Sequence, residues 1–160
     1  MSVAFTKEED SEAAAAHLPD LPVSPHPNLV TASGLQQIEA RLLEARAAYA
    51  AAQGGDVRAD RTALARATRD LRYWSARRGS ARLTPADPGR AGAQFGSRIT
   101  FLRADGRTQS FRIVGEDEAD PKAGAISYVS PLARALLGRE PGDEVDRPEG
   151  ALEVLAVETP

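Results

Sequence analysis

The sequence predicts an α+β protein, in which an antiparallel two-helix coiled coil is followed by a small antiparallel sheet domain with one short helix. Three observations carry this prediction. Apolar residues recur at alternating spacings of three and four along the first half of the chain, which is typical of a coiled coil. An Asp105-Gly106 pair separates two strand-like runs, which indicates a hairpin. Residues 126–145 read as strand, turn, helix, turn and strand.

The composition limits the classes of protein to consider. In 160 residues only 5% are aromatic, which favours two modest parts over one large core. The net charge of -3 gives no overall nucleic-acid signature. The absence of cysteine excludes a disulfide framework and a thiolate metal site. No apolar run approaches the roughly 20 residues that span a bilayer, and the acidic start lacks the features of a signal peptide, so we expect a cytoplasmic protein without a membrane partner.

Residues 1–30 have the composition of a flexible tail. An acidic opening is followed by an alanine run and by four prolines in a context that favours extended backbone. The acidic residues are Glu8, Glu9, Asp10 and Glu12, and the prolines are Pro19, Pro22, Pro25 and Pro27. A second interpretation stays open, namely that residues 18–30 dock on another part of the protein or on a partner.

Residues 31–78 predict the helical hairpin. Thr31 or Ser33 is the candidate N-cap of the first helix, and Gly54-Gly55 ends it. The first seam consists of Leu35, Ile38, Leu42, Ala45, Tyr49 and Ala52, and the second of Val57, Asp60, Leu64, Ala67, Leu71 and Trp74. Alanines on and beside these seams allow a close approach of the two backbones, so a thin two-helix arm is favoured over a bundle.

The two helices differ in charge. The second contains Arg58, Arg61, Arg66, Arg69, Arg72, Arg77 and Arg78, against only Asp60 and Asp70. A solvated face is one explanation of this run. Contact with an anionic polymer such as RNA, or with an acidic protein surface, is the other, and Arg58, Arg61, Arg66 and Arg69 are the candidate contacts.

Glycine and proline mark residues 79–92 as a linker, and residues 93–160 as the sheet domain. The expected strands are 98–103, 107–114, 125–129, 144–147 and 152–157. Ser130 is the expected N-cap of the short helix, with Pro131 in its first position, and Gly138 lies where the chain leaves that helix with positive φ.

Two segments of this domain resemble a known family. Residues 128–138 (YVSPLARALLG) with 142–145 (GDEV), and residues 111–121 (FRIVGEDEADP), are similar to the C-terminal domain of the bacterial Gre transcript cleavage factors. The resemblance extends from about residue 31 to 158. It implies an FKBP-like C-terminal domain that grips two helices at the rim of the secondary channel of RNA polymerase, while the coiled coil enters the channel.

The matching segment also implies the residues that bind polymerase. These are Ser130, Pro131, Leu132, Arg134 and Leu137. A structural role competes with this one, because Leu132, Leu136 and Leu137 suit a core. We expect Leu136 to be buried and Arg134 to be exposed.

The resemblance implies two acidic residues at the hairpin tip, which help polymerase to hold its second Mg²⁺. Residues 54–60 form the expected tip. Asp56 matches the first carboxylate, Ala59 stands where a glutamate is expected, and Asp60 follows one position later. Asp56 and Asp60 could recruit the metal together, Asp56 could only cap the second helix, or both could make other channel contacts.

The arms are also shorter than those of the cleavage factors, by roughly eight to ten residues each, so the tip would stop about 12 to 15 Å short of the usual depth. The short hairpin is similar to that of Rnk-type relatives, and some relatives with altered tips inhibit polymerase. A magnesium ligand must approach to about 2 Å, so a tip held back by even one turn would not act on the metal.

The resemblance therefore implies an RNA polymerase-binding elongation regulator of the Gre family with weak or no stimulation of cleavage. It is expected to be a monomeric accessory factor and not an enzyme, without a cofactor or a stably bound metal of its own, and to share the Mg²⁺ of polymerase at most. The nascent RNA 3′ end is a second expected contact.

Three alternatives remain. One is an active cleavage factor that uses Asp56 and Asp60, and the second is an RNA-binding helical hairpin. The third is a prolyl isomerase-like domain, which is disfavoured by few aromatic residues for a proline pocket and by two histidines, His17 and His26, that both lie in the tail.

Overall fold

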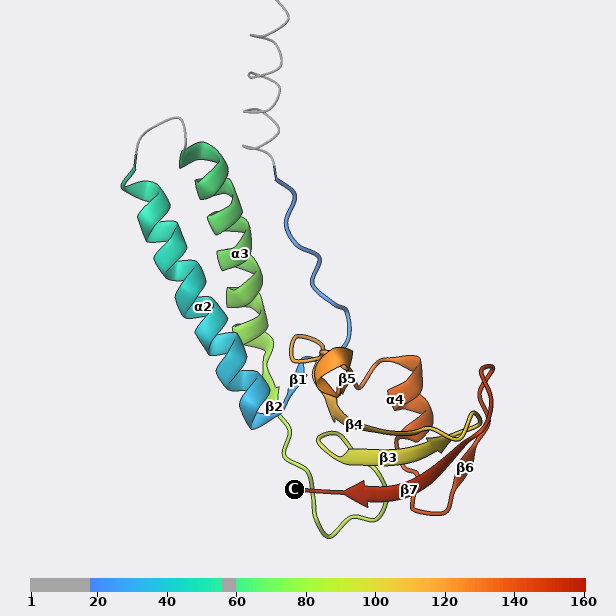
Figure 1. The fold of residues 1–160 in the computed structure, drawn as a ribbon. Helices are drawn as coiled ribbons and strands as arrows, with labels where there is room; N and C mark the ends of the chain where they lie inside the picture. The colour runs from blue at the N-terminus through green and yellow to red at the C-terminus, as the bar shows by residue number, and fades with distance from the viewer. Residues whose placement is uncertain (1–17, 56–59) are drawn as a thin grey trace, which may run out of the picture. The chain divides into compact units, whose positions relative to one another are not determined.

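The computed structural model describes residues 18–55 and 60–160, apart from the side chain of Asp60. It divides into two compact units (Figure 1). Among the described residues, the first unit contains those up to Pro25 and Gln37–Ser80, and the second contains His26–Gln36 and Ala81–Pro160. Each unit is described by itself below.

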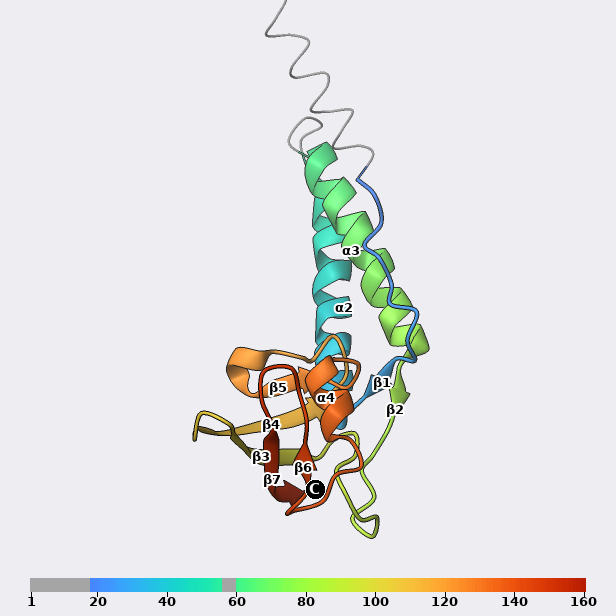
Figure 2. The ribbon, with the colours of Figure 1, turned by 90° about the vertical axis from the view of Figure 1, so that its right-hand side faces the viewer.

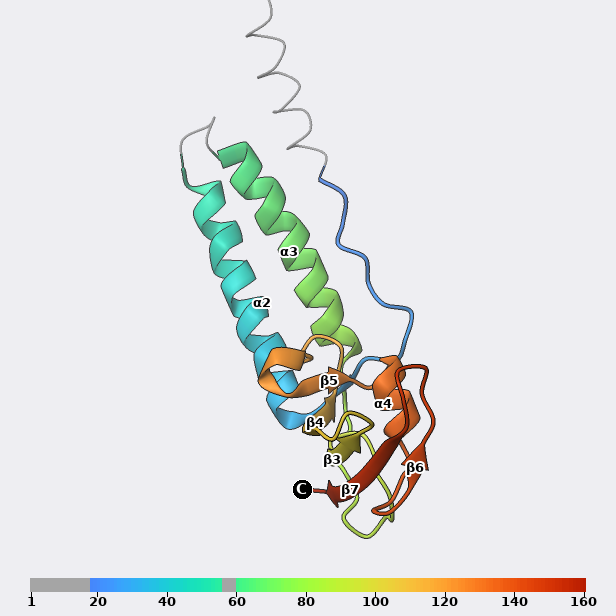
Figure 3. The same ribbon diagram turned by 45° about the vertical axis from the view of Figure 1, so that its right-hand side comes forward.

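The first unit is the helical hairpin. Its helices are α2 (Ala32–Gln53) and α3 (Asp60–Ser80), which run side by side in all three views (Figures 1, 2 and 3). At 1.5 Å per residue each helix is about 30 Å long. The buried seam positions of α2 are Ile38, Leu42 and Ala45, and Ala67 is buried on α3.

The seam confirms the heptad prediction within the described residues. Leu64, Leu71 and Trp74 are half-buried on α3, as expected of seam positions, whereas Val57 lies outside the described residues. The small side chains at Ala45 and Ala67 explain how two helices pack closely without a third layer. An ion pair between Arg78 Nε and Glu39 Oε1, 2.9 Å apart, links the two helices.

The second unit contains a five-stranded sheet in the order β5-β4-β3-β7-β6. The strands are β3 (Arg98–Arg103), β4 (Thr108–Val114), β5 (Ala125–Ser127), β6 (Glu144–Val145) and β7 (Leu152–Glu158). Helices together with this sheet confirm the α+β class. The expected hairpin at Asp105-Gly106 is present, since β3 and β4 pair antiparallel and Gly106 has a φ of 85°.

One detail of the sheet differs from the prediction of a purely antiparallel arrangement. β5 pairs with β4 in parallel. The connection between them includes the short 3₁₀ helix η1 (Pro121–Ala123), which carries the chain back so that β5 runs in the direction of β4. A short run with no tight turn before it could not reveal this direction from sequence alone.

Both the end of the expected tail and the expected linker contribute a strand to this unit. β1 (Leu29–Val30) pairs in parallel with β2 (Arg82–Leu83). β1 also lies against Gly115, where a Cβ would be 2.3 Å from the carbonyl oxygen of Leu29. Only glycine permits this approach, so the segment before α2 is part of the sheet domain's structure.

The first turn of α2 is joined to the same unit by Glu118. Its carboxylate accepts hydrogen bonds from the Thr31 hydroxyl at 2.6 Å and from the Ser33 hydroxyl. Thr31 is also the N-cap of α2, because its Oγ1 accepts a hydrogen bond from the Gly34 N–H at 3.0 Å. The Glu118 side chain is only 8% exposed. We call these contacts the N-terminal clasp.

The core lies between the sheet and α4 (Pro131–Leu136). Alternate residues of the central strands point into it, with Ile99 and Phe101 from β3 and Val154 from β7. Ala133 and Leu136 of α4 are fully buried against them, so the expectation that Leu136 belongs to the core is confirmed. Within the described part of the chain, no helix is long and apolar enough to cross a membrane.

Candidate functional site

The start of α4 presents the residues expected to bind polymerase. Ser130 is the N-cap, since its Oγ accepts a hydrogen bond from the Ala133 N–H at 3.2 Å, and Pro131 follows in the first turn. Pro131 and Arg134 are exposed, and Leu132 is half-buried. The helix thus directs Pro131, Leu132 and Arg134 to or near the surface, while Ser130 acts mainly as a cap.

Leu137 lies at the end of α4, where its N–H donates to the carbonyl of Ala133. Like Leu132, it is half-buried and packs against the core cluster. Its apolar side chain therefore contributes to the packing of the domain.

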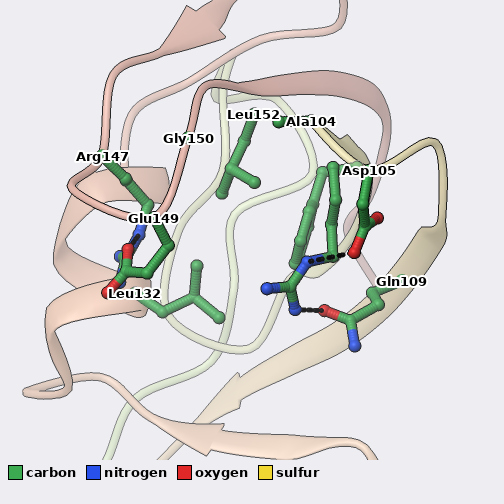
Figure 4. A pocket seen from close by; sticks show the side chains of 10 residues that line it. Ala104, Asp105, Gln109, Leu132, Arg147, Glu149, Gly150 and Leu152 are labelled. Atoms are coloured by element: carbon green, nitrogen blue, oxygen red, sulfur yellow. Dashed lines mark hydrogen bonds and ion pairs between the residues drawn. The ribbon is translucent and has the colours of Figure 1, made fainter.

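Leu132 lines a pocket of about 240 Å³. Phe101 and Leu152 complete its apolar part. Figure 4 shows Leu132 and Leu152 between the Arg147 and Glu149 pair on one side and Asp105 with Gln109 on the other. The pocket therefore has an apolar interior and a polar edge, as is usual for a site that takes an apolar side chain.

Two turns form the edge of the pocket, and they meet at Gly150. This residue has a φ of 119°, and a Cβ on it would lie 2.8 Å from the Ala104 Cβ. The turn between β6 and β7 and the turn between β3 and β4 are therefore in close contact, and a larger residue at position 150 would separate them.

The charged groups at the edge are paired. Arg103 donates to Gln109 Oε1 at 2.8 Å, and Arg147 Nε lies 3.2 Å from Glu149 Oε2. In the adjacent turn the Arg107 guanidinium donates to Asp105 Oδ2, which, together with the Arg107 backbone N–H, lowers the pKa of Asp105. A hydrogen bond from its own backbone N–H and one from Arg147 lower the pKa of Glu149. The lowered pKa values keep Asp105 and Glu149 ionised around neutral pH.

Sequence reasoning found Leu132 but missed the rest of the pocket. Its walls come from segments far apart in the sequence, which meet because β3 pairs with β7. The turns at Asp105-Gly106 and at 148–150 were recognisable. Their meeting depends on the strand order, which the local pattern does not contain. The residues that were missed are Phe101, Arg103, Ala104, Asp105, Gln109, Arg147, Glu149, Gly150 and Leu152.

The remaining candidate site residues, which were expected to contact RNA or a metal ion, lie on the hairpin. Arg61 and Arg66 are exposed on α3, and Arg69 is half-buried with its guanidinium hydrogen-bonded to Asp70 Oδ1 at 3.2 Å. Asp60 opens α3, but its side chain, like Asp56 and Arg58, lies outside the described residues. The structure therefore brings Arg61, Arg66 and Arg69 onto one helix and leaves the pairing of Asp56 with Asp60 as a prediction.

The described residues can also be searched for a proline pocket and for a metal site. Of the four aromatic residues of the sheet domain, Phe95, Phe101, Phe111 and Tyr128, only Phe101 lines the pocket beside α4. Within residues 18–55 and 60–160, no cluster of three acidic or histidine side chains is suited to hold a metal ion.

Known proteins resemble mainly the sheet domain. The family model of the transcription elongation factor GreA/GreB C-terminal domain matches residues 91–159. Transcription elongation factor GreB of Neisseria meningitidis is 48% identical over 68 residues, which cover 40% of this chain and 42% of that protein. GreA of Hyphomonas neptunium is 51% identical over 61 residues, which cover 36% and 39%. The chain thus spans about two fifths of the length of these relatives.

Among solved structures, GreA factor homolog 1 (Gfh1) of Thermus thermophilus is 20% identical. The match covers 83% of this chain and 99% of that one, with a TM-score of 0.37. This superposition is too loose to carry an argument about the whole chain. The sheet domain, with its pocket and the exposed start of α4, is therefore the part of the chain that is similar to the GreA/GreB C-terminal domain.

Proposed function

We propose that the protein is a transcription elongation regulator that binds RNA polymerase through the start of α4 and the pocket beside it. The observation that carries this proposal is the combination of a GreA/GreB C-terminal domain over residues 91–159 with an exposed Pro131-Leu132 step at the edge of an apolar pocket. Pro131, Leu132 and Arg134 make the contact, at the rim of the secondary channel.

The pocket suits a protein partner better than a small charged substrate. Its interior is formed by Leu132, Leu152 and Phe101, and its arginines are already paired with side chains of this chain. An apolar side chain of the partner would fill the interior, while exposed Arg134 contributes a charged contact at the edge. Ser130 and Leu137 support this surface from within the domain.

The hairpin is the part that acts after docking, by entering the secondary channel. Its helices, of 22 and 21 residues, are about 30 Å long. With Ala59 in place of a tip glutamate, weak or no stimulation of cleavage is favoured, and the protein modulates elongation and backtracked complexes as an accessory factor in the cytoplasm, as a monomer. The alternative, active cleavage, has Asp56 and Asp60 help to hold the second Mg²⁺ near the RNA 3′ end.

Binding is tested by capture of purified core RNA polymerase on the immobilised full chain. Pro131→Asp is expected to reduce capture at least tenfold. An acidic residue in the first turn is compatible with a helix, so the fold of α4 is retained. Leu155→Asp is the matched control, since Leu155 is 43% exposed on β7 and outside the pocket. Equal capture by both variants and the wild type would contradict docking through α4.

Cleavage is tested separately with backtracked elongation complexes. The regulator proposal expects no release of 3′ RNA fragments above the background of polymerase alone. Release that requires the protein and disappears with Asp56→Ala plus Asp60→Ala would establish the alternative, an active cleavage factor.

A further inference from the structure

A second hollow in the unit of the sheet domain has a volume of about 310 Å³ and shares no residue with the pocket beside α4. Its walls come from segments far apart in the sequence, namely the start of α2, the end of β2 with the turn that follows, Gly96 and β4 at Arg112. A volume of this size lies at the lower end of the range for pockets that bind small molecules. We call it the β2 pocket.

The lining of the β2 pocket is mostly apolar. β2 and the turn after it contribute Leu83, Pro85 and Ala86, and α2 contributes Ala32. Leu83 is 56% exposed, although its side chain is large and apolar. A hydrocarbon group that covers these side chains would bind favourably, because its own surface and theirs would both be removed from water. The pocket therefore suits a ligand with an apolar part.

Backbone contacts hold the walls in place. The Thr84 N–H donates to the carbonyl of Val30 at 2.9 Å, which fixes the end of β2 against β1. Pro85 then ends β2, because it has no N–H to continue the ladder. Gly96, with a φ of 90°, lies beside the turn, where its Cβ would be 3.5 Å from the Ala86 Cβ. The pocket is thus formed before a ligand binds, which lowers the entropic cost of binding.

Arg112 has the only charged side chain among the described residues that line this pocket. Its direction follows from the alternation of β4, since Phe111 and Ile113 on either side of it pack in the core. Arg112 therefore lies on the opposite face of the sheet, and its side chain is 33% exposed. Its guanidinium is partly withdrawn from water, where a bound anion would interact with it more strongly than at an exposed site.

The partners of Arg112 within the domain are distant. Its Nε is 3.4 Å from the carbonyl oxygen of Gly96, and its Nη1 is 3.5 Å from Ser33 Oγ and 3.8 Å from Glu118 Oε1. The Glu118 carboxylate makes shorter hydrogen bonds in the N-terminal clasp. Among the described residues, Arg112 Nη2 has no hydrogen-bond partner. The guanidinium thus retains donors for a carboxylate, which matches its planar fork.

We propose that the β2 pocket binds a small carboxylic acid with an apolar tail. The carboxylate pairs with the Arg112 guanidinium, and the tail covers Leu83, Pro85 and Ala32. An anionic ligand is favoured over a neutral or cationic one, because a neutral ligand would leave the donors of Arg112 without an acceptor and a cation would be repelled. The bound acid would join β2, α2 and β4, and would therefore stabilise the pairing of β1 with β2.

The test is an NMR titration of the isotopically labelled full chain with octanoate. Saturable shifts are expected at the amides of Leu83, Thr84, Ala86 and Gly96, with a dissociation constant in the millimolar range. Octan-1-ol, which lacks the charge, should bind about tenfold more weakly. Acetate, which lacks the tail, should also bind more weakly. Amide exchange of Thr84 should slow when octanoate is bound.

A first variant tests the ion pair. Arg112→Gln is expected to lower the affinity for octanoate about tenfold, to the level of octan-1-ol, and to leave the affinity for octan-1-ol unchanged. Local distortion of the pocket would instead weaken both ligands. Arg98→Gln is the matched control, because Arg98 lies opposite Arg112 on β3 but does not line the pocket. It should leave the affinity for octanoate unchanged.

A second variant tests the apolar wall and keeps the core intact. Leu83→Ser should weaken octanoate and octan-1-ol alike, several-fold in each case. Leu43→Ser is its control, since Leu43 is 69% exposed on α2 and outside the pocket. It should change neither affinity.

The proposal is overturned if octanoate causes no saturable shift up to its solubility limit, or if the shifts centre on Leu132 and Leu152 beside α4. It is also overturned if Arg112→Gln weakens octan-1-ol as much as octanoate, or if Arg98→Gln has the same effect as Arg112→Gln. Arg112→Gln should still capture polymerase, and Pro131→Asp should still bind octanoate. Failure of this proposal and failure of the docking proposal are therefore distinguishable.

Discussion

The sheet domain and the hairpin are stabilised in different ways. The sheet domain has a layered core of large side chains, such as Phe101, Ile99 and Leu136, and the GreA/GreB family model matches this domain. The hairpin has a narrow seam in which Ile38 and Leu42 alternate with alanines. The proposed docking surface therefore rests on the more deeply packed part of the chain, while the arginines proposed to act after docking lie on the thinner part.

The largest effect is expected in the core of the sheet domain. Phe101→Ala removes a buried ring that also lines the pocket, and should lower the free energy of unfolding by about 3–5 kcal/mol. Leu155→Ala, on the exposed side of β7, should change it by about 0.5 kcal/mol or less. Urea unfolding followed by circular dichroism measures both free energies. Equal effects of the two substitutions would contradict the burial of Phe101 in the core.

A smaller effect is expected in the hairpin seam. Ala67→Leu adds volume where the helices are in close contact, and should cost about 1–3 kcal/mol. Ala63→Leu, on the exposed side of the same helix, is the control and should be nearly neutral. Loss of helicity on heating, recorded at the far-ultraviolet helix band, compares the two. A seam that accepts leucine at position 67 without cost would contradict close approach through alanine.

The N-terminal clasp should contribute somewhat less to the free energy of unfolding. Glu118→Ala leaves the hydroxyls of Thr31 and Ser33 without their acceptor, and should cost about 1–2 kcal/mol. Amide exchange of Arg82 and Thr84 should accelerate, because their N–H groups donate to the carbonyls of Asn28 and Val30, and β1 loses its support beside β2. Glu153→Ala, at an exposed position of β7, serves as the control and should alter neither measurement.

The smallest effect concerns pH. Hydrogen bonds from the side chain and backbone of Arg107 lower the pKa of Asp105, so the contact stabilises the turn above the ordinary pKa of an aspartate. The contribution is lost as the pH falls through the lowered pKa. An NMR titration of the Asp105 carboxyl should show a pKa below the ordinary value, which Arg107→Gln should raise. An unchanged pKa in that variant would assign the shift to another cause.

Local sequence patterns predicted the helices and strands better than the contacts between them. The heptad spacing located α2 and α3, and the Ser130-Pro131 step located the start of α4, because caps and periodicity are properties of neighbouring residues. The pairing of β1 with β2 and the pocket edge at Gly150 were not predicted. Both depend on contacts between distant segments, for which a two-residue strand or a single glycine carries no readable signal.

The tail illustrates the same limit. Proline content indicated extended backbone at 18–30. The contacts of Leu18 and Asp20 with residues of α3 could not be predicted, because they join segments far apart in the sequence. Asp56 and Arg58 lie outside the described residues, so the tip chemistry rests on the sequence alone.

The contact between β1 and Gly115 has a practical consequence for anyone who wishes to produce the C-terminal domain by itself. A fragment cut at residues 91–159 would lose β1 and β2, open the face of Gly115 and leave the Glu118 carboxylate with neither hydroxyl. The self-contained unit is discontinuous, with His26–Gln36 as one piece and Ala81–Pro160 as the other. A designed connection that replaces the hairpin and joins these two pieces is therefore the appropriate starting point for a minimal domain.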